Sequence, residues 1–136
     1  MDCDIIKNFI NANDKFASAS NIRLVKVEPG YAEGEMDITP DSMNSRGFVQ
    51  GGAIFTLCDL TAAGASNSRN NGMIAMGGNI SYIRPGTGKK LRAVAKEINR
   101  GQRTGLFAVD VFNDEGKIVA HATINGFATG EPLVKE

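Results

Sequence analysis

Apolar and polar residues alternate with two different periods along this chain, and each change of period marks a new element. Over residues 4–17 the apolar side chains recur at helical spacing, which predicts an amphipathic helix lying as a lid on the core. Two strictly alternating stretches follow, residues 22–28 and 31–38, with Pro29-Gly30 between them. Alternation interrupted by a proline and a glycine is typical of a β-hairpin.

The next predicted element is a helix of unusual composition. An irregular loop over residues 39–49 ends just before Gly51-Gly52, and these glycines open an apolar run that we expect to be helical over about residues 51–66. A polar run ending at Gly72 terminates it. Because this helix is apolar on all sides, it is predicted to be a core helix.

The rest of the chain alternates with the period of strands. We expect four of them, at about residues 73–84, 90–100, 103–113 and 117–128. Short turns between them favour antiparallel pairing. One apolar helix among six strands must be wrapped by the sheet. The sequence therefore predicts a single α+β domain over residues 1–136, with a curved antiparallel sheet around one long central helix.

Composition narrows the class of protein. Fifteen basic and fifteen acidic residues cancel, and no long run of either sign occurs, which argues against nucleic acid or a membrane as a partner. The first ten residues do not resemble a secretion signal, and no segment approaches the length of a membrane span. Cys3 and Cys58 lie far apart and are predicted to be free thiols. We expect a soluble, cytoplasmic protein.

Asp59 is the residue of the central helix that most needs an explanation. Apolar residues surround it on every predicted face, and a buried carboxylate is costly without compensating hydrogen bonds. A structural aspartate could bond a neighbouring hydroxyl, with Thr56 and Thr61 as candidates. A catalytic aspartate could attack an acyl carbon or deprotonate a water that does so. Function is the favoured interpretation, and the sequence leaves both catalytic roles open.

Gly51 is the second candidate, because the start of a helix has unpaired backbone amides and a positive dipole end. Without a side chain, its backbone can approach a substrate carbonyl closely; the alternative is that the glycine pair serves only a tight turn from loop to helix. At about 1.5 Å per residue, Gly51 and Asp59 are roughly 12 Å apart along the helix. If both serve one site, the simplest arrangement is two chains across a symmetric interface.

Further polar residues surround this helix in sequence. Asn44 and Gln50 could orient a water or a substrate carbonyl, although loop asparagines usually form turns. Two basic turns, over residues 84–90 and 100–104, could bind phosphate or could simply be solvated. His121 is the single histidine, and no spacing of paired ligands occurs, so no metal or other cofactor is predicted.

Taken in order, these motifs form a recognisable set. They are Asn44-x5-Gln50-Gly51-Gly52-x6-Asp59, then Asn79-Ile80-Ser81-Tyr82-Ile83-Arg84-Pro85, then Gly101-Gln102-Arg103-Thr104. The set resembles the hotdog-fold acyl-CoA thioesterases, and within them the phenylacetic acid degradation thioesterase branch. The resemblance covers about residues 20–130 and implies a curved antiparallel sheet around a long helix.

The resemblance also implies roles for particular residues. Gly51 matches the amide that polarises the thioester carbonyl, Asp59 matches the nucleophile or base supplied by the partner subunit, and Asn44 matches an asparagine at the catalytic pocket. Coenzyme A, as part of the substrate, is expected along the interface of a homotetramer built as a dimer of dimers. Candidate contacts to the substrate are Gly52, Tyr82, Arg84, Pro85, Arg100, Gln102, Arg103 and Thr104.

Two departures from the family pattern concern the site. Many members carry histidine where this chain has Gln50, and glutamine does not titrate near neutral pH. Members also often carry a serine or threonine at the start of the following strand, near Ala75. Hydrolysis of an acyl-CoA thioester is the leading prediction. The alternatives are a non-catalytic acyl-CoA-binding protein and, less favoured because of the position of His121, an enoyl-CoA hydratase or dehydratase.

Overall fold

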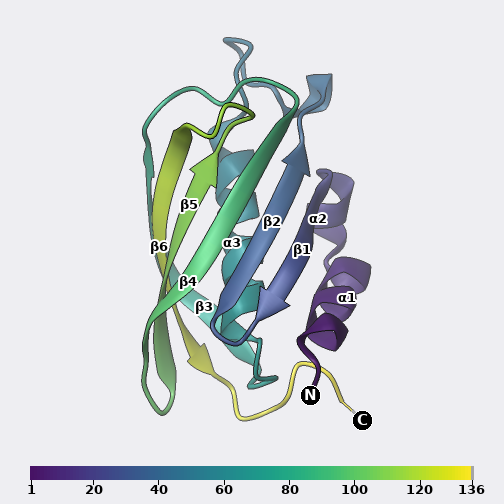
Figure 1. The fold of residues 1–136 in the computed structure, drawn as a ribbon, viewed down its shortest axis with the longest axis vertical. Helices are drawn as coiled ribbons and strands as arrows, with labels where there is room; N and C mark the ends of the chain where they lie inside the picture. The colour runs from purple at the N-terminus through teal and green to yellow at the C-terminus, as the bar shows by residue number, and fades with distance from the viewer. Residues whose placement is uncertain (136) are drawn as a thin grey trace.

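Six strands form one antiparallel sheet that curves around the longest helix (Figure 1). The structure is a computed structural model, and it describes residues 1–135. The strands are β1 (Ile22–Glu28), β2 (Tyr31–Asp37), β3 (Met73–Tyr82), β4 (Lys90–Arg100), β5 (Thr104–Phe112) and β6 (Ile118–Ala128). They lie in the order β1-β2-β4-β5-β6-β3, and all neighbouring pairs are antiparallel. The predicted α+β architecture is confirmed.

The central helix, α3 (Gly51–Ser66), packs against the inner face of this sheet. Gln50 is its N-cap, because the side-chain carbonyl accepts a hydrogen bond from the N–H of Ala53 at 3.1 Å. The strands bury only one side of α3, however, since Gly52 and Asp59 are exposed. The predicted curved sheet around one central helix is confirmed, but the expectation that Asp59 is buried is wrong for the single chain. An apolar helix composition does not specify whether its own chain or another covers each face.

The helix predicted over residues 4–17 is divided in two. α1 (Cys3–Asn13) ends at Asp14, and Asp14 then caps α2 (Lys15–Ala19) by accepting a hydrogen bond from Ala17 N–H at 3.0 Å. The backbone of Asp14 is extended, which separates the two helices. Both lie alongside β1 at the edge of the sheet (Figure 1), and α1 contacts β1 more extensively than it contacts α3. The helices thus flank the sheet, and the description of this segment as a lid on the core is corrected.

The two edges of the sheet differ in how they are protected. On β1, the side-chain N–H of Asn11 donates to the Leu24 backbone carbonyl at 2.9 Å, and the Leu24 backbone N–H donates to the side-chain carbonyl of Asn11 at 2.8 Å. At the other edge, β3 contains no charged residue and no proline, and it exposes the side chains of Ile74, Met76 and Tyr82. Natural edge strands are usually blunted by charges, prolines or a covering element. β3 is therefore suited to pair with a second chain.

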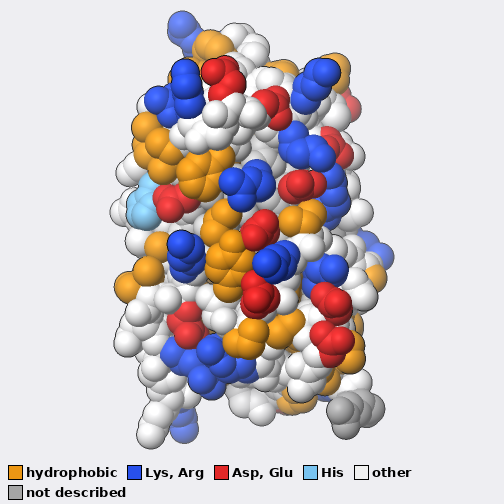
Figure 2. Space-filling model, viewed as in Figure 1, with side chains coloured by type: hydrophobic (Ala, Val, Ile, Leu, Met, Phe, Trp, Pro, Cys, Tyr) orange, Lys and Arg blue, Asp and Glu red, His pale blue; other side chains and the backbone are white. Residues whose placement is uncertain are grey.

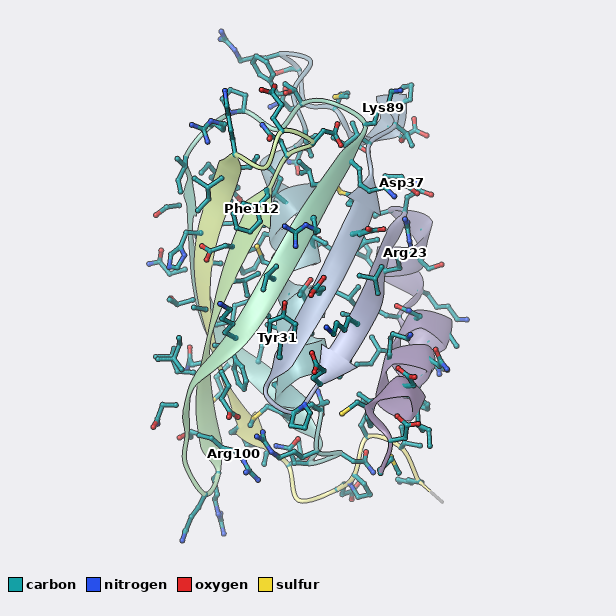
Figure 3. The ribbon with its side chains drawn as sticks, in the orientation of Figure 1. Arg23, Tyr31, Asp37, Lys89, Arg100 and Phe112 are labelled. Atoms are coloured by element: carbon teal, nitrogen blue, oxygen red, sulfur yellow. The ribbon has the colours of Figure 1, made fainter. Side chains whose placement is uncertain are left out.

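The outer face of the sheet mixes apolar side chains with paired charges (Figure 2). Arg23 of β1 lies beside two carboxylates of β2, at 2.9 Å from Asp37 and 3.0 Å from Glu35 (Figure 3). Within residues 1–135, no helix is both long and apolar enough to cross a membrane.

Candidate active site

The first turn of α3 lies beside the end of β3. The Tyr82 hydroxyl donates a hydrogen bond to the Gly51 carbonyl at 2.9 Å. A Cβ placed on Gly51 would lie 3.1 Å from the Tyr82 ring, so the absence of a side chain allows this close approach. Among the described residues, the N–H groups of Gly51 and Gly52 have no hydrogen-bond acceptor. These amides at the positive end of the helix dipole are available to a substrate oxygen.

Gly51 opens onto a cavity of about 390 Å³, the Gly51 cavity. Its walls come from the loop before α3, the first turns of α3 and the segment that follows β3. Five residues selected from the sequence line it, namely Asn44, Gly51, Tyr82, Arg84 and Pro85. The fold thus brings together motifs that are up to 41 residues apart in the sequence.

The side chains of Asn44 and Gln50 both bond to backbone groups. The carbonyl oxygen of Asn44 accepts hydrogen bonds from the N–H of Arg46 at 2.9 Å and of Phe48 at 3.1 Å, so this residue shapes the loop. Gln50 caps α3 and, with Gly52, lines a different cavity of about 410 Å³. The structure therefore places Asn44 in the Gly51 cavity, and Gln50 and Gly52 in the neighbouring one.

Arg84 also has a structural contact. Its guanidinium donates a hydrogen bond to the carbonyl of Ile118 at the start of β6. The main-chain N–H groups of Ile83 and Arg84 both donate to the Val119 carbonyl, at 2.8 and 3.2 Å. These bonds hold the segment after β3 against β6 and so fix the outer wall of the Gly51 cavity.

Asp59 lines a separate cavity of about 190 Å³, the Asp59 cavity. Most of its wall is apolar and comes from α3, β3, β5 and β6: Ala62, Ala63, Met73, Ile74, Ala75, Phe107, Ile124 and Gly126. Desolvation by these neighbours, with a smaller effect from the charge of Asp14, raises the pKa of Asp59 above its ordinary value, although the side chain retains contact with solvent. A carboxylate of raised pKa is a better base.

The hydroxyl groups near Asp59 are arranged differently from the prediction. Thr56 and Thr61 donate to carbonyls of their own helix, at 2.8 and 2.7 Å, so neither partners Asp59. Ala75 lines the Asp59 cavity with a methyl group at the position where the family resemblance led us to consider a hydroxyl. Sequence reasoning missed Ser66, the second polar side chain of this cavity. Its spacing of seven residues from Asp59, two turns along one helix face, was an available signal.

The basic hairpin between β4 and β5 lies far from the Gly51 cavity of the same chain. The Gly51 cavity is tied to the segment just before β4, since the Val49 N–H donates to the Gly86 carbonyl at 3.0 Å and both residues line this cavity. Lys89 and Arg100 mark opposite ends of β4 (Figure 3). The predicted contacts at this hairpin are all exposed: Arg100, Gln102, Arg103 and Thr104. One chain alone does not bring them to Gly51.

His121 lines neither the Gly51 cavity nor the Asp59 cavity. It is exposed on β6, and its Nδ1 atom is 2.7 Å from the carboxylate of Asp110. The hydratase alternative needs a base at the substrate cavity, and this position does not provide one. In the part of the chain that the structure describes, no three His, Cys, Asp or Glu residues form a metal-binding group. Cys3 and Cys58 are free thiols, as predicted, and burial raises the pKa of Cys58 to about 12.

Comparison with known proteins identifies the family. A family model described as the thioesterase superfamily matches residues 46–120. The chain belongs to the thioesterase superfamily. It is 32% identical over 125 residues to the acyl-coenzyme A thioesterase PaaI of Escherichia coli K12, covering 88% of this chain and 89% of that protein. It is also 35% identical over 118 residues to a putative esterase of Archaeoglobus fulgidus, covering 86% and 77% of the two chains.

Solved structures agree with this assignment. The E. coli PaaI protein from the phenylacetic acid degradation operon superposes with a TM-score of 0.91 at 27% identity, covering 96% of this chain and 95% of that one. A hypothetical thioesterase from Streptococcus pneumoniae TIGR4, solved with coenzyme A, has a TM-score of 0.83 at 26% identity, covering 93% and 98%. The predicted hotdog fold is confirmed, and the chain is a thioester hydrolase.

Proposed function

We propose that this protein hydrolyses acyl-CoA thioesters at sites shared between two chains, where Gly51 of one chain polarises the thioester carbonyl and Asp59 of the other activates the attacking group. The observation that carries the proposal is that Gly51 and Asp59 lie on one helix but line two cavities with no residue in common. The similarity to an acyl-coenzyme A thioesterase and to a thioesterase solved with coenzyme A supports the substrate class.

The edge strand β3 supports the pairing of two chains. Ile74 and Ala75, near its start, line the Asp59 cavity, and Tyr82, at its end, lines the Gly51 cavity. If two copies of β3 pair antiparallel about a two-fold axis, the end of one strand lies beside the start of the other. Each Gly51 cavity then meets the Asp59 cavity of the second copy. The pairing also covers the apolar edge that a single chain leaves exposed.

The reaction follows from these two groups. The Gly51 amide donates to the thioester oxygen and stabilises the negative charge that develops on it. The Asp59 carboxylate either removes a proton from the attacking water or attacks the carbonyl carbon to form an anhydride that water then hydrolyses. In both routes one water is consumed, the C–S bond breaks, and the coenzyme A thiolate leaves and is protonated. The products are a free acid and coenzyme A, and coenzyme A acts as part of the substrate.

The same pairing assigns the basic residues to coenzyme A. Arg84 and Pro85 line the Gly51 cavity. In the antiparallel arrangement, the Arg100–Thr104 hairpin of the second copy lies near the Gly51 end of the first copy. Its two guanidinium groups are suited to the phosphates of coenzyme A. For a dimer of dimers, a further contact surface is needed, and the outer sheet face around Tyr31 and Phe112, with its mixture of apolar and charged groups, is our candidate.

The direct test is thiol release from a panel of aryl and linear acyl-CoAs by the wild type and by Asp59→Asn. We expect turnover by the wild type and a loss of roughly a hundredfold or more in the variant, as for removal of a catalytic base. Equal rates for the two proteins would refute the role of Asp59. Tight binding of the thioesters without turnover would support a binding protein instead. Native mass spectrometry of the wild type measures the number of chains in the assembly.

A further inference from the structure

A further cavity lies beside α1 and shares part of its wall with the Asp59 cavity. This α1 cavity measures about 230 Å³, and its walls come from α1, the second half of α3, the start of β3 and the C-terminal segment. Its lining residues are Phe9, Ile10, Asn13, Asp14, Ala63, Asn67, Met73 and Leu133. Ala63 and Met73 also line the Asp59 cavity, so these two side chains separate the two spaces.

Met73 makes most of this partition, because Ala63 contributes only a methyl group. The Met73 backbone is fixed, since its N–H donates to the Asn67 side-chain carbonyl at 2.8 Å and its carbonyl accepts from the Asn67 amide at 3.1 Å. The side chain lies over two glycines: a Cβ on Gly126 would be 3.2 Å from Met73 Cγ, and one on Gly105 would be 3.4 Å from Cε. Methionine is unbranched and adapts its rotamer readily. The partition is thus one adaptable side chain on a fixed backbone.

The lining of the α1 cavity is mainly apolar, and each of its three polar side chains makes a hydrogen bond within the protein. The Asn13 amide donates to the Phe9 carbonyl at 2.8 Å, and Asp14 caps α2. Asn67 holds both polar groups of the Met73 backbone. The apolar part of the lining is formed by the side chains of Phe9, Ile10, Ala63, Met73 and Leu133.

We propose that the α1 cavity binds the distal part of a long linear acyl group, and that Met73 is the gate between it and the Asp59 cavity. This inference rests on the proposed function, which places the thioester at Asp59. The Asp59 cavity alone is slightly larger than the roughly 150 Å³ cavity that holds one benzene molecule in an engineered protein. A short or single-ring acyl group therefore ends at Met73. A longer unbranched chain turns Met73 aside and continues between Ala63 and α1.

The test compares butyryl-CoA with decanoyl-CoA as the ratio of their kcat/KM values, decanoyl over butyryl. Met73→Ala opens the partition and should raise this ratio about tenfold, the scale of a change of one or two methylene groups in an apolar pocket. Met73→Phe closes it and should lower the ratio by a similar factor. Leu133→Trp fills the α1 cavity from its far wall, without touching the Asp59 cavity, and should also lower the ratio. Val25→Ala, an apolar truncation at an exposed position on β1 that lines neither cavity, is the control and should not change it.

The outcomes separate this inference from the proposed function. If the wild type releases thiol from neither substrate, the proposed function fails. If it hydrolyses butyryl-CoA and the ratio stays constant in Met73→Ala, Met73→Phe and Leu133→Trp, the gate is refuted while the proposed function stands. Circular dichroism and thermal unfolding identify a variant that does not fold. The decanoyl-to-butyryl ratios of the other two variants then decide whether Met73 is the gate.

Discussion

Tyr82, the last residue of β3, holds Gly51, the first residue of α3, through a hydrogen bond of 2.9 Å from its hydroxyl to the glycine carbonyl. Desolvation raises the pKa of Tyr82 above its ordinary value, which favours the protonated phenol that donates this bond. The bond joins the edge strand that we expect to carry the second chain to the helix end that we expect to bind the thioester oxygen. The position of the amide that we propose as the oxyanion donor therefore depends on the sheet edge.

Tyr82→Phe should weaken this joint while preserving the ring. The free energy of unfolding should fall by about 1 kcal/mol, the usual net value of one hydrogen bond. We also expect a lower kcat/KM, because the first turn of α3 is held less firmly. Urea unfolding at fixed protein concentration and thiol-release kinetics measure the two effects. A variant with wild-type kinetics would show that the amide is positioned by α3 alone.

The role of the Gly51 amide can be tested directly, because Gly51 is the first residue of α3 and its N–H can be removed there by a proline. Proline is well tolerated there, and the extended backbone of Gln50, with φ −63° and ψ 135°, suits a residue before proline. Gly51→Pro removes the N–H donor, and Gly51→Ala adds a Cβ at the same place but keeps the donor. Removing one oxyanion donor typically costs about a hundredfold or more in kcat.

We therefore expect Gly51→Pro to lose far more activity than Gly51→Ala. The alanine variant controls for crowding against Tyr82, because its added Cβ lies 3.1 Å from the ring. Circular dichroism checks that α3 is intact in both. Similar losses in the two variants would assign the effect to crowding and would remove the Gly51 amide from the mechanism.

Sharing of the site between chains can be tested by mixing two inactive variants. A chain with Asp59→Asn retains Gly51, and a chain with Gly51→Pro retains Asp59. In a mixed dimer, one of the two shared sites then contains both native groups. Unfolding and refolding an equal mixture should restore about a quarter of the wild-type rate, because half of randomly formed dimers are mixed and each has one intact site. A site within a single chain would give no recovery.

The elements were largely predictable from the sequence, because local periodicity and turn residues determine them. The hairpin over 22–38 and the start of α3 at Gly51 follow from such local signals. The division of the first helix at Asp14 was missed, since aspartate is compatible with both a helix surface and an N-cap. The apolar spacing on both sides of it continues in phase, so periodicity alone gives no sign of the break.

The cavities were less predictable, because their walls combine distant parts of the chain. Met73 and Phe107 meet beside Asp59 only after β3, β5 and β6 have assembled. The exposure of Asp59 was also beyond sequence reasoning. Composition indicates that α3 prefers apolar surroundings, but it does not distinguish burial by the same chain from burial by a second one. The cost of holding Asp59 beside apolar groups can be measured as its effect on the free energy of unfolding.

Asp59 and Asp37 should affect stability in opposite directions. The pKa of Asp59 is raised in the folded chain, so the folded state binds more protons than the unfolded state just above the ordinary carboxyl pKa of 3.8. Its contribution therefore becomes unfavourable as pH rises through its folded pKa. The free energy of unfolding of Asp59→Asn should exceed that of the wild type at about pH 7 and should equal it at acid pH.

For Asp37, the hydrogen bond from Arg23 lowers the pKa, with further contributions from the charges of Arg23 and Lys90. Its contribution is present above the ordinary carboxyl pKa and is lost as pH falls through the folded pKa. Asp37→Asn should therefore destabilise the protein at neutral pH, and the difference should disappear in acid. Urea unfolding of both variants across this pH range, at one fixed chain concentration, measures the two signs. A loss of stability at neutral pH in Asp59→Asn would mean that favourable hydrogen bonds hold Asp59 in the assembled protein. Asp59 would then be a structural aspartate and not a catalytic one retained at a cost in stability.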